Sequence, residues 1–226
     1  PNYTATYTFA GGETEGILAY TLDFTDAAGN NATQISATTD ASQVRFDETP
    51  PTANPVTIFS NNFNTARAKV GDDVIISFTV SETLLVDPSV TIDGNAATID
   101  NTNAPSYTAT YTMQALDNEG VLTYTLDFTD LAGNTASQIT ATTDASQVIF
   151  DETAPTAPAV SIFSNNANTS LAKVGDVVTL SFTIDEPLLG SPTVTIDGNA
   201  TTLAGSYPSF TATYTMQAGD TEAVLG

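Results

Sequence analysis

Pairs of neighbouring carboxylates are the residues of this sequence whose type and spacing could do chemistry. Asp47–Glu48 and Asp151–Glu152 stand in the heptapeptides FDETPPT and FDETAPT, each just ahead of a stiff proline. Two ionised acids side by side repel each other, so a folded chain gains nothing from them unless a positive group lies between them. The spacing therefore points to a bound cation.

Two further acidic patterns recur along the chain. An acid-x-acid turn follows each YTF or YTM segment, and its residues vary (Glu-Thr-Glu, Asp-Asn-Glu, Asp-Thr-Glu) while its charge is retained. Retained charge with varied identity suggests that charge is the useful property. More acids stand in two loops. The members of the two patterns are Glu13 and Glu15, Asp117 and Glu119, Asp220 and Glu222, and the loop acids Glu82, Asp130, Asp185 and Glu186.

The composition decides which cation fits and which partners do not. The chain of 226 residues has 26 acids, four bases and a formal charge of −22, and it contains no His, Cys or Trp. An all-oxygen donor set suits Ca²⁺, which takes about six to eight oxygen ligands, better than Zn²⁺. Strong acidity argues against nucleic acid and anionic lipid as partners. No apolar run is long enough to span a membrane, so no membrane insertion is expected.

The same composition argues against an enzyme. Paired carboxylates could in principle serve a glycosidase. The chain offers no His or Cys, almost no cationic group to stabilise an oxyanion, and no phosphate-binding glycine loop. Catalytic groups are also not expected in near-identical copies. We therefore expect a non-enzymatic protein.

An internal repeat organises the whole chain. YTATYTF at 3–9 returns as YTATYTM at 107–113 and as FTATYTM at 210–216. These matches predict three domains: the C-terminal part of one repeat at 1–46, a complete repeat at 47–150, and the N-terminal part of the next at 151–226. The two partial copies duplicate one region, since Pro1 corresponds to Pro105 and Gly226 to about Thr123. This overlap argues against clean complementation between the ends of two chains.

Hydrophobic residues in the complete repeat alternate with a period of two, which indicates β-strands. Val74, Ile76 and Phe78 face one way, and threonines alternate with the apolar residues of the other strands. Further strands are expected near 55–60, 88–92, 96–99, 135–141 and 146–150. Seven or more short strands in about 100 residues predict an all-β fold of tandem immunoglobulin-like sandwiches in an elongated head-to-tail array.

The repeat resembles a known family. The segments DETAPT, SNNANTSLAKVGD, VTIDGNA, YTATYTMQAGDTE and YTLDFTDLAGN are similar to the tandem bacterial immunoglobulin-like repeats of giant surface adhesins. Such repeats occur in the extender regions of calcium-dependent biofilm and ice-binding adhesins and in gliding-motility adhesins of Bacteroidetes. The resemblance implies an extracellular location on the bacterial cell surface and a spacer role, with the neighbouring repeats as partners.

The topology of such a sandwich predicts which acids meet. The turn between the fifth and sixth strands faces the linker and two loops of the next repeat. The first junction should then assemble Glu13, Glu15, Asp47, Glu48, Glu82 and Asp130, and the second Asp117, Glu119, Asp151, Glu152, Asp185 and Glu186. We expect Ca²⁺ at both junctions, stiffening an adhesin stalk. Two alternatives stay open: a repeat unit that assembles with other copies into a surface filament or sheath, and a glycan- or protein-binding adhesive module.

Overall fold

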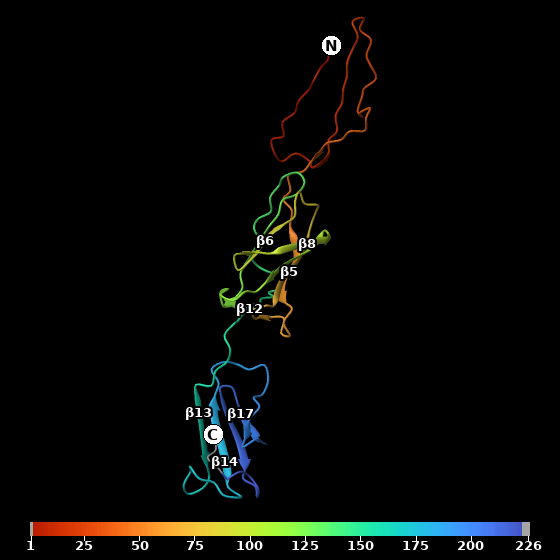
Figure 1. Ribbon diagram of the computed structural model, residues 1–226. Coiled ribbons are helices and arrows are strands. Elements are labelled where there is room, and N and C mark those ends of the chain that lie inside the picture. Colours follow the sequence, from red (N-terminus) through yellow and green to blue (C-terminus); the bar gives the residue numbers. More distant parts are fainter. Residues whose placement is uncertain (1, 223–226) are drawn as a thin grey trace. The chain divides into compact units, whose positions relative to one another are not determined.

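The computed structural model describes residues 2–222, which form β-strands and turns (Figure 1). Within that range, no helix is long and apolar enough to cross a membrane. The chain divides into two compact units, Pro1–Glu152 and Thr153–Gly226. The division lies two residues from the expected boundary at 150, and residues 1–46 share a unit with the complete repeat. The expected three-part division stays a prediction.

The complete repeat is built around a four-stranded antiparallel sheet in the order β3-β5-β9-β8. Its strands are β3 (Ala53–Ser60), β5 (Asp73–Val80), β8 (Thr98–Asn103) and β9 (Ser106–Thr112). In β5, buried residues alternate with partly exposed ones, and Val74, Ile76 and Phe78 lie in the core. β-branched and aromatic residues at a period of two suit such a half-buried strand. The predicted alternation is confirmed.

Two smaller ladders supply the other side of the core. One contains β6 (Ser89–Ile92), β7 (Asn95–Ala96) and β11 (Tyr124–Asp127); the other contains β4 (Arg67–Ala68), β10 (Gly120–Val121) and β12 (Ile149–Phe150). Leu126, Val148 and Phe150 belong to the same buried cluster as Val74 and Ile76. Because each face buries its apolar side chains against the other, the repeat is an all-β sandwich of immunoglobulin type, as the sequence predicts.

Two expected strands are shorter than predicted, and the one expected near 96–99 is divided between β7, which ends at Ala96, and β8, which begins at Thr98. Residues 135–141 form only isolated bridges, Thr129↔Thr135 and Leu126↔Ile139, and only Ile149–Phe150 of the range 146–150 is a strand. In the first segment the backbone nitrogen of Ala136 donates to the carbonyl of Phe128 and that of Ile139 donates to the carbonyl of Leu126, both at 3.0 Å. Asp144 and Ser146 form a local turn instead, in which the carboxylate accepts from the backbone nitrogen of Ser146 at 2.9 Å.

Residues 16–46 keep part of the local structure of the matching part of the complete repeat, whereas residues 3–9, which match β9, form no strand. β1 (Gly16–Ile17) pairs with β2 (Arg45–Phe46), as β10 pairs with β12. The bridge Leu22↔Ile35 corresponds to Leu126↔Ile139. Several side chains whose counterparts fill the core of the complete repeat, such as Tyr20, Leu22 and Val44, are exposed in this copy, and Leu18 and Phe46 are partly exposed.

The second unit has a four-stranded antiparallel sheet in the order β13-β14-β18-β17 and a small hairpin. Its strands are β13 (Ala159–Ser164), β14 (Val177–Thr183), β17 (Thr202–Ser206), β18 (Ser209–Thr215), β15 (Thr195–Ile196) and β16 (Asn199–Ala200). The register matches the complete repeat, since Val160 pairs with Phe182 as Val56 pairs with Phe78. Val160, Ile162 and Phe163 of this sheet are exposed.

Candidate metal centre

Three acidic side chains from distant parts of the chain meet in the first unit. Asp47 follows β2, Glu82 lies in the turn after β5, and Asp130 lies in the turn after β11. One carboxylate oxygen of each lies within 4.8 Å of those of the other two. The meeting is brought about by the bridge Leu84↔Asp130, which holds the loop that follows Glu82 against the turn. Among the predicted acids of the first junction, these three form the compact group.

Asp130 is the buried member of the group. It is fully buried, and its Oδ1 accepts hydrogen bonds from the backbone nitrogens of Gly133 and Asn134, both at 2.8 Å. Burial acts to raise the pKa of this carboxyl, but the hydrogen bonds, the side chain of Asn134 first, outweigh it and lower the pKa below 3.8. Asp130 therefore carries its negative charge in the interior at neutral pH.

The turn that holds Asp130 is encoded locally by the sequence DLAGN. In the first copy, DAAGN forms the same turn, where Asp26 Oδ1 accepts from the backbone nitrogens of Ala28 and Asn30. Gly133 adopts a φ of 98°, a left-handed conformation that glycine takes without strain. The turn thus needs no metal in order to form, and it presents the carboxylate to whatever lies next to it.

Asn134 is the residue that the sequence analysis did not single out. Its Nδ2 donates both to Asp130 Oδ2 at 2.9 Å and to the backbone carbonyl of Asp47 at 3.1 Å. One side-chain amide therefore ties the linker to the turn. The only signal in the sequence is the recurrence of Asn at the end of DAAGN and DLAGN, which by itself indicates no more than a turn.

Glu82 experiences the negative charge of the group most directly. Burial raises its pKa above 4.5, and the charges of Asp47, Asp130 and Glu15 raise it further, while Arg45 acts in the opposite direction. Like charges at this separation disfavour ionisation. The ionised group therefore stores repulsion that a bound cation would relieve.

Glu15 and Glu48 connect the segment 12–15 to the linker by hydrogen bonds. Glu15 Oε1 accepts from the backbone nitrogen of Glu48 at 2.8 Å and from Thr49 Oγ1 at 2.7 Å. Both oxygens of Glu48 accept from the backbone nitrogen of Gly12 at 3.1 Å. These contacts hold the start of the linker against the preceding turn.

The end of the linker is held by the complete repeat. The backbone nitrogen of Thr52 donates to Ser81 Oγ at 3.0 Å, and the backbone nitrogen of Ser81 donates to the carbonyl of Thr52 at 2.9 Å. Pro51, between the two attachments, is buried. The linker is therefore fixed at both of its ends.

Glu13 belongs to a local turn instead of the three-acid group. It accepts from the backbone nitrogen of Ala10 at 2.9 Å and from the hydroxyl of Tyr7 at 3.2 Å. Asp117 repeats this arrangement with the backbone nitrogen of Gln114 at 2.7 Å and with the hydroxyl of Tyr111. The first acid of each acid-x-acid turn thus closes its own turn.

The acids of the second predicted junction lie in two different units, and each set is described by itself. In the first unit, Glu119 accepts from the backbone nitrogen of Glu152 at 2.8 Å, as Glu15 does from Glu48, and the backbone nitrogen of Asp151 donates to the carbonyl of Ala68. Asp185 accepts from the backbone nitrogen of Thr156 at 2.7 Å in the second unit, and Glu186 follows it directly.

The three-acid group matches the preferences of a hard divalent cation. Asp47, Glu82 and Asp130 offer only oxygen atoms, and the chain has no His or Cys. Ca²⁺ accepts carboxylate, carbonyl and water oxygens in flexible numbers, so three carboxylates together with water would suffice for a site of modest affinity. Ca²⁺ fits this donor set better than Zn²⁺, which favours nitrogen and sulfur.

Comparisons with known proteins identify no family for this chain. No family model matches the sequence, and no curated protein matches it. Among solved structures, the chain is similar to BcpA, the major pilin subunit of Bacillus cereus, with a TM-score of 0.22 and 11% sequence identity over 88% of this chain and 79% of the pilin. At this level of similarity two chains need not share a fold.

Proposed function

We propose that the chain is part of the stalk of a large bacterial surface adhesin, in which Ca²⁺ fixes the boundary between successive sandwich repeats. The observation that carries the proposal is the meeting of Asp47, Glu82 and Asp130, whose carboxylate oxygens lie within 4.8 Å of one another. They come from the linker and from two loops of the complete repeat. A cation held by all three would tie the linker to both loops.

Calcium would act on the mechanics of the boundary. Extracellular calcium modules have dissociation constants of about 10⁻⁴ to 10⁻³ M. At about a hundredfold excess over the dissociation constant, one site stabilises the bound arrangement by about 2.7 kcal/mol. Burial is the main cause of the raised pKa of Glu82, and repulsion by Asp47 and Asp130 adds to it; without calcium this repulsion acts against the close approach of the three carboxylates. The boundary would therefore be held firmly only in the presence of the ion.

The repetition of the sequence supports a spacer role. YTLDFTDAAGN and YTLDFTDLAGN differ at one position, and in both turns the final Asn donates to the Asp carboxylate from its backbone nitrogen and from its side-chain amide. A ligand-binding surface in each copy would require exposed residues suited to a ligand, whereas near-identical copies suit a structure that adds length. The bacterial cell surface is the location that this role implies. Labelling of intact cells with an antibody against residues 47–150 tests the location, and labelling only after lysis would contradict it.

A calcium titration of the full chain tests the proposed ion. Thermal unfolding with and without about 10 mM Ca²⁺, well above the expected dissociation constant, should show a higher Tm with calcium. Asp47→Asn should remove most of that rise. Asp100→Asn is the matched control, since Asp100 is exposed on β8 and, within residues 2–222, accepts only from the backbone nitrogen of Thr102. An equal rise in the wild type, in Asp47→Asn and in the control would refute the site.

A further inference from the structure

The outward face of the large sheet in the complete repeat is almost free of charge. The strands β3, β5, β8 and β9 contain two acids, Asp73 and Asp100, and no base, whereas the whole chain has 26 acids. Asp73 lies at the start of β5 and Asp100 on the edge strand β8, so both stand at the margin. The outward-pointing residues between them form the surface that we call the neutral face: Thr57, Phe59, Ile75, Ser77, Thr108 and Thr110.

The same pattern recurs in the second unit. Its strands β13, β14, β17 and β18 contain no charged residue. Phe163 pairs with Thr179 at the positions that Phe59 and Ile75 occupy in the complete repeat. The other side of the complete repeat does carry charge, with Asp127 on β11. Charged residues are depleted at the centres of protein interfaces, so this pattern suits a surface that makes close contact.

The exposure of the neutral face does not depend on the partial repeats. The face belongs to the complete repeat, where Val74 and Ile76 pack into the core and Ser77, on the same strand, points outward and is partly exposed. The linkers on either side are attached at strand ends, through the backbone nitrogens of Thr52 and Asp151. The face is therefore open in a repeat that has all its strands.

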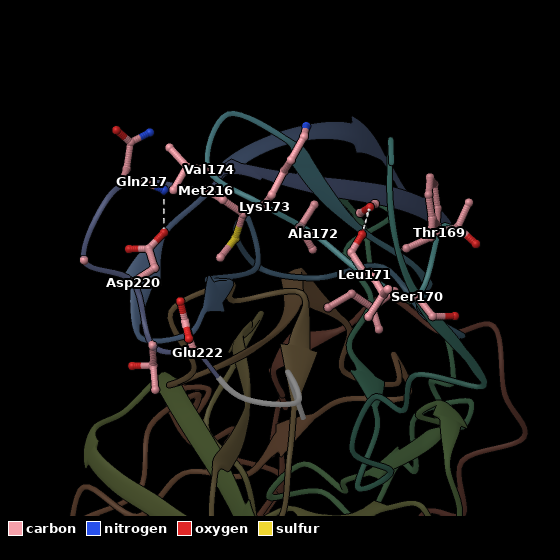
Figure 2. Close-up of a pocket in the computed structure, with 16 residues that line it drawn as sticks. Thr169, Ser170, Leu171, Ala172, Lys173, Val174, Met216, Gln217, Asp220 and Glu222 are labelled. Carbon is pink, nitrogen blue, oxygen red and sulfur yellow. Dashed lines mark hydrogen bonds between the residues drawn. The ribbon is translucent and has the colours of Figure 1, made fainter. Parts of the chain in front are cut away.

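The inner side of the second unit's sheet is a different case. A pocket of about 730 Å³ lies there, and Ala172 and Met216 are among the residues that line it (Figure 2). Their counterparts Ala68 and Met113 belong, with Phe150, to the core of the complete repeat. The pocket thus corresponds to a filled interior, and we assign no ligand to it.

The neutral face combines a small apolar strip with free hydroxyl groups. Phe59, which is 38% exposed, lies beside Ile75 on the neighbouring strand. Ser77 pairs with Thr108, and Ile75 pairs with Thr110. Among residues 2–222, the hydroxyls of Ser77, Thr108 and Thr110 have no hydrogen-bond partner, so they are open to a partner outside the chain.

This chemistry is self-complementary. Two copies related by a two-fold axis bring the same patch against itself, so each group must tolerate its own kind. A hydroxyl both donates and accepts, and apolar side chains pack against each other, whereas carboxylates repel. The net charge of −22 keeps copies apart at other orientations. The neutral face is the part of the described repeat where two copies meet least repulsion.

We propose that the neutral face is a lateral contact through which two copies of this chain associate side by side. The apolar strips of Phe59 and Ile75 pack together, and the hydroxyls of Ser77, Thr108 and Thr110 pair across the contact. No metal ion takes part, so the inference is independent of the proposed function.

The size of the face sets the expected strength. Four strands about 4.8 Å apart, each of about seven residues at about 3.3 Å, give roughly 440 Å². Two such faces bury about 900 Å² in total, below the value of about 1,200 Å² at which stable complexes begin. The face of the second unit would double this to about 1,800 Å². We therefore expect dissociation in the micromolar range or above.

Sedimentation of the full chain in chelator tests the proposal. The mass should rise with concentration from 23.4 kDa towards twice that value between about 1 and 500 µM. The rise should be larger at about 500 mM than at about 50 mM NaCl, because salt screens the repulsion between acidic chains. Contacts made by calcium or by opposite charges would show the reverse or vanish in chelator, and either result would overturn the proposal.

Matched substitutions locate the contact. Thr110→Asp together with Thr213→Asp, its counterpart on β18, should weaken association about a hundredfold, since like charges would face each other. Thr123→Asp adds the same charge at an exposed position off the sheet and should change association little. Phe59→Thr keeps a good strand residue and should weaken association about tenfold. Phe63→Thr, at a 90% exposed loop position, is its control.

Thermal unfolding of each variant shows whether it is folded, and only folded variants are compared. Association that the Asp pair and Phe59→Thr leave unchanged would come from another surface and would overturn the proposal. A wild type that stays monomeric at 500 µM in about 500 mM NaCl would do the same. If that monomer binds soluble dextran through Phe59, the face serves a neutral glycan and the proposal is wrong.

Discussion

Substitution of Glu82 by glutamine should change stability in opposite directions with and without calcium. Glu82 lies within 4.8 Å of Asp47 and Asp130, measured between carboxylate oxygens. At an effective dielectric constant of about 20, each pair repels by about 3 kcal/mol. Glu82 and Asp47 are partly exposed, so solvent screening reduces the total for both pairs to about 1.5 kcal/mol. Glu82→Gln removes this repulsion and keeps the size of the side chain.

The expected sizes follow from these values. Without calcium, Glu82→Gln should raise the Tm by about 3–6 °C, since 1 kcal/mol corresponds to about 2–4 °C for a chain of this length. With excess calcium, the wild type should gain about 5–10 °C and the variant should gain almost nothing. The order of the two melting temperatures should therefore reverse when calcium is added. Differential scanning calorimetry of both proteins in chelator and in calcium measures all four values.

The pH dependence gives an independent check of the same reasoning. In the folded protein the pKa of Glu82 is raised above 4.5, chiefly by burial and then by its acidic neighbours. A raised carboxyl pKa lowers stability above that pKa, and the loss disappears as the group becomes protonated. Below pH 4.5, wild type and Glu82→Gln should melt alike in chelator. A variant that melts lower than the wild type at pH 7 without calcium, or one that keeps the full calcium response, would refute the electrostatic account.

Three more substitutions test other parts of the structure. Tyr124→Phe should leave the free energy of unfolding in urea unchanged or raise it by about 1 kcal/mol. The Tyr124 hydroxyl is buried with no hydrogen-bond partner in residues 2–222, and burial raises its pKa to about 12. A loss of more than about 1 kcal/mol would show that the hydroxyl has a partner. Asn134→Ala should lower the free energy of unfolding by about 1–3 kcal/mol. The substitution leaves the buried Asp130 with one hydrogen-bond donor fewer and the Asp47 carbonyl without the Asn134 amide. Equal stability would show that the hydrogen bonds of this amide are unimportant. Asp176→Asn should destabilise the protein at pH 7, because hydrogen bonds, that of the Lys173 side chain first, lower the Asp176 pKa from 3.8 to about 2. The difference in stability between wild type and variant should shrink as the pH falls from 3.8 to about 2. A difference that stays constant over this range would refute the assignment.

The fold could be predicted from the sequence because a strand with one buried face alternates apolar and polar residues. Alternation of apolar and threonine residues marks β5 and β9 without knowledge of their partners. The extent of the strand expected at 135–141 was harder to predict. Its pairing at Thr135 and Ile139 depends on the path of the neighbouring segment and not on its own alternation of residues. Strand length is set by the neighbouring strand as much as by the strand itself.

The candidate site could be predicted only in part, because a sequence does not say what an acid faces. The topology of the sandwich indicated the loops of Glu82 and Asp130, and the two loops do lie together. Glu15 came from the same pattern but faces the backbone nitrogen of Glu48, and Asp117 closes its own turn. The residue type alone does not distinguish an acid that accepts a hydrogen bond from a backbone N–H group from one that faces other acids. Whether a metal binds stays a prediction.

The attachment of the linker at both ends determines how the chain would respond to tension. Glu15 holds Glu48 and Thr49 at one end, and Ser81 holds Thr52 at the other. Only two prolines lie between these attachments, and proline has a restricted backbone. The linker thus contains almost no slack, so a pulling force would load the hydrogen bonds at its two ends before any residue could extend. Rupture under load should begin at these bonds and not inside a sandwich.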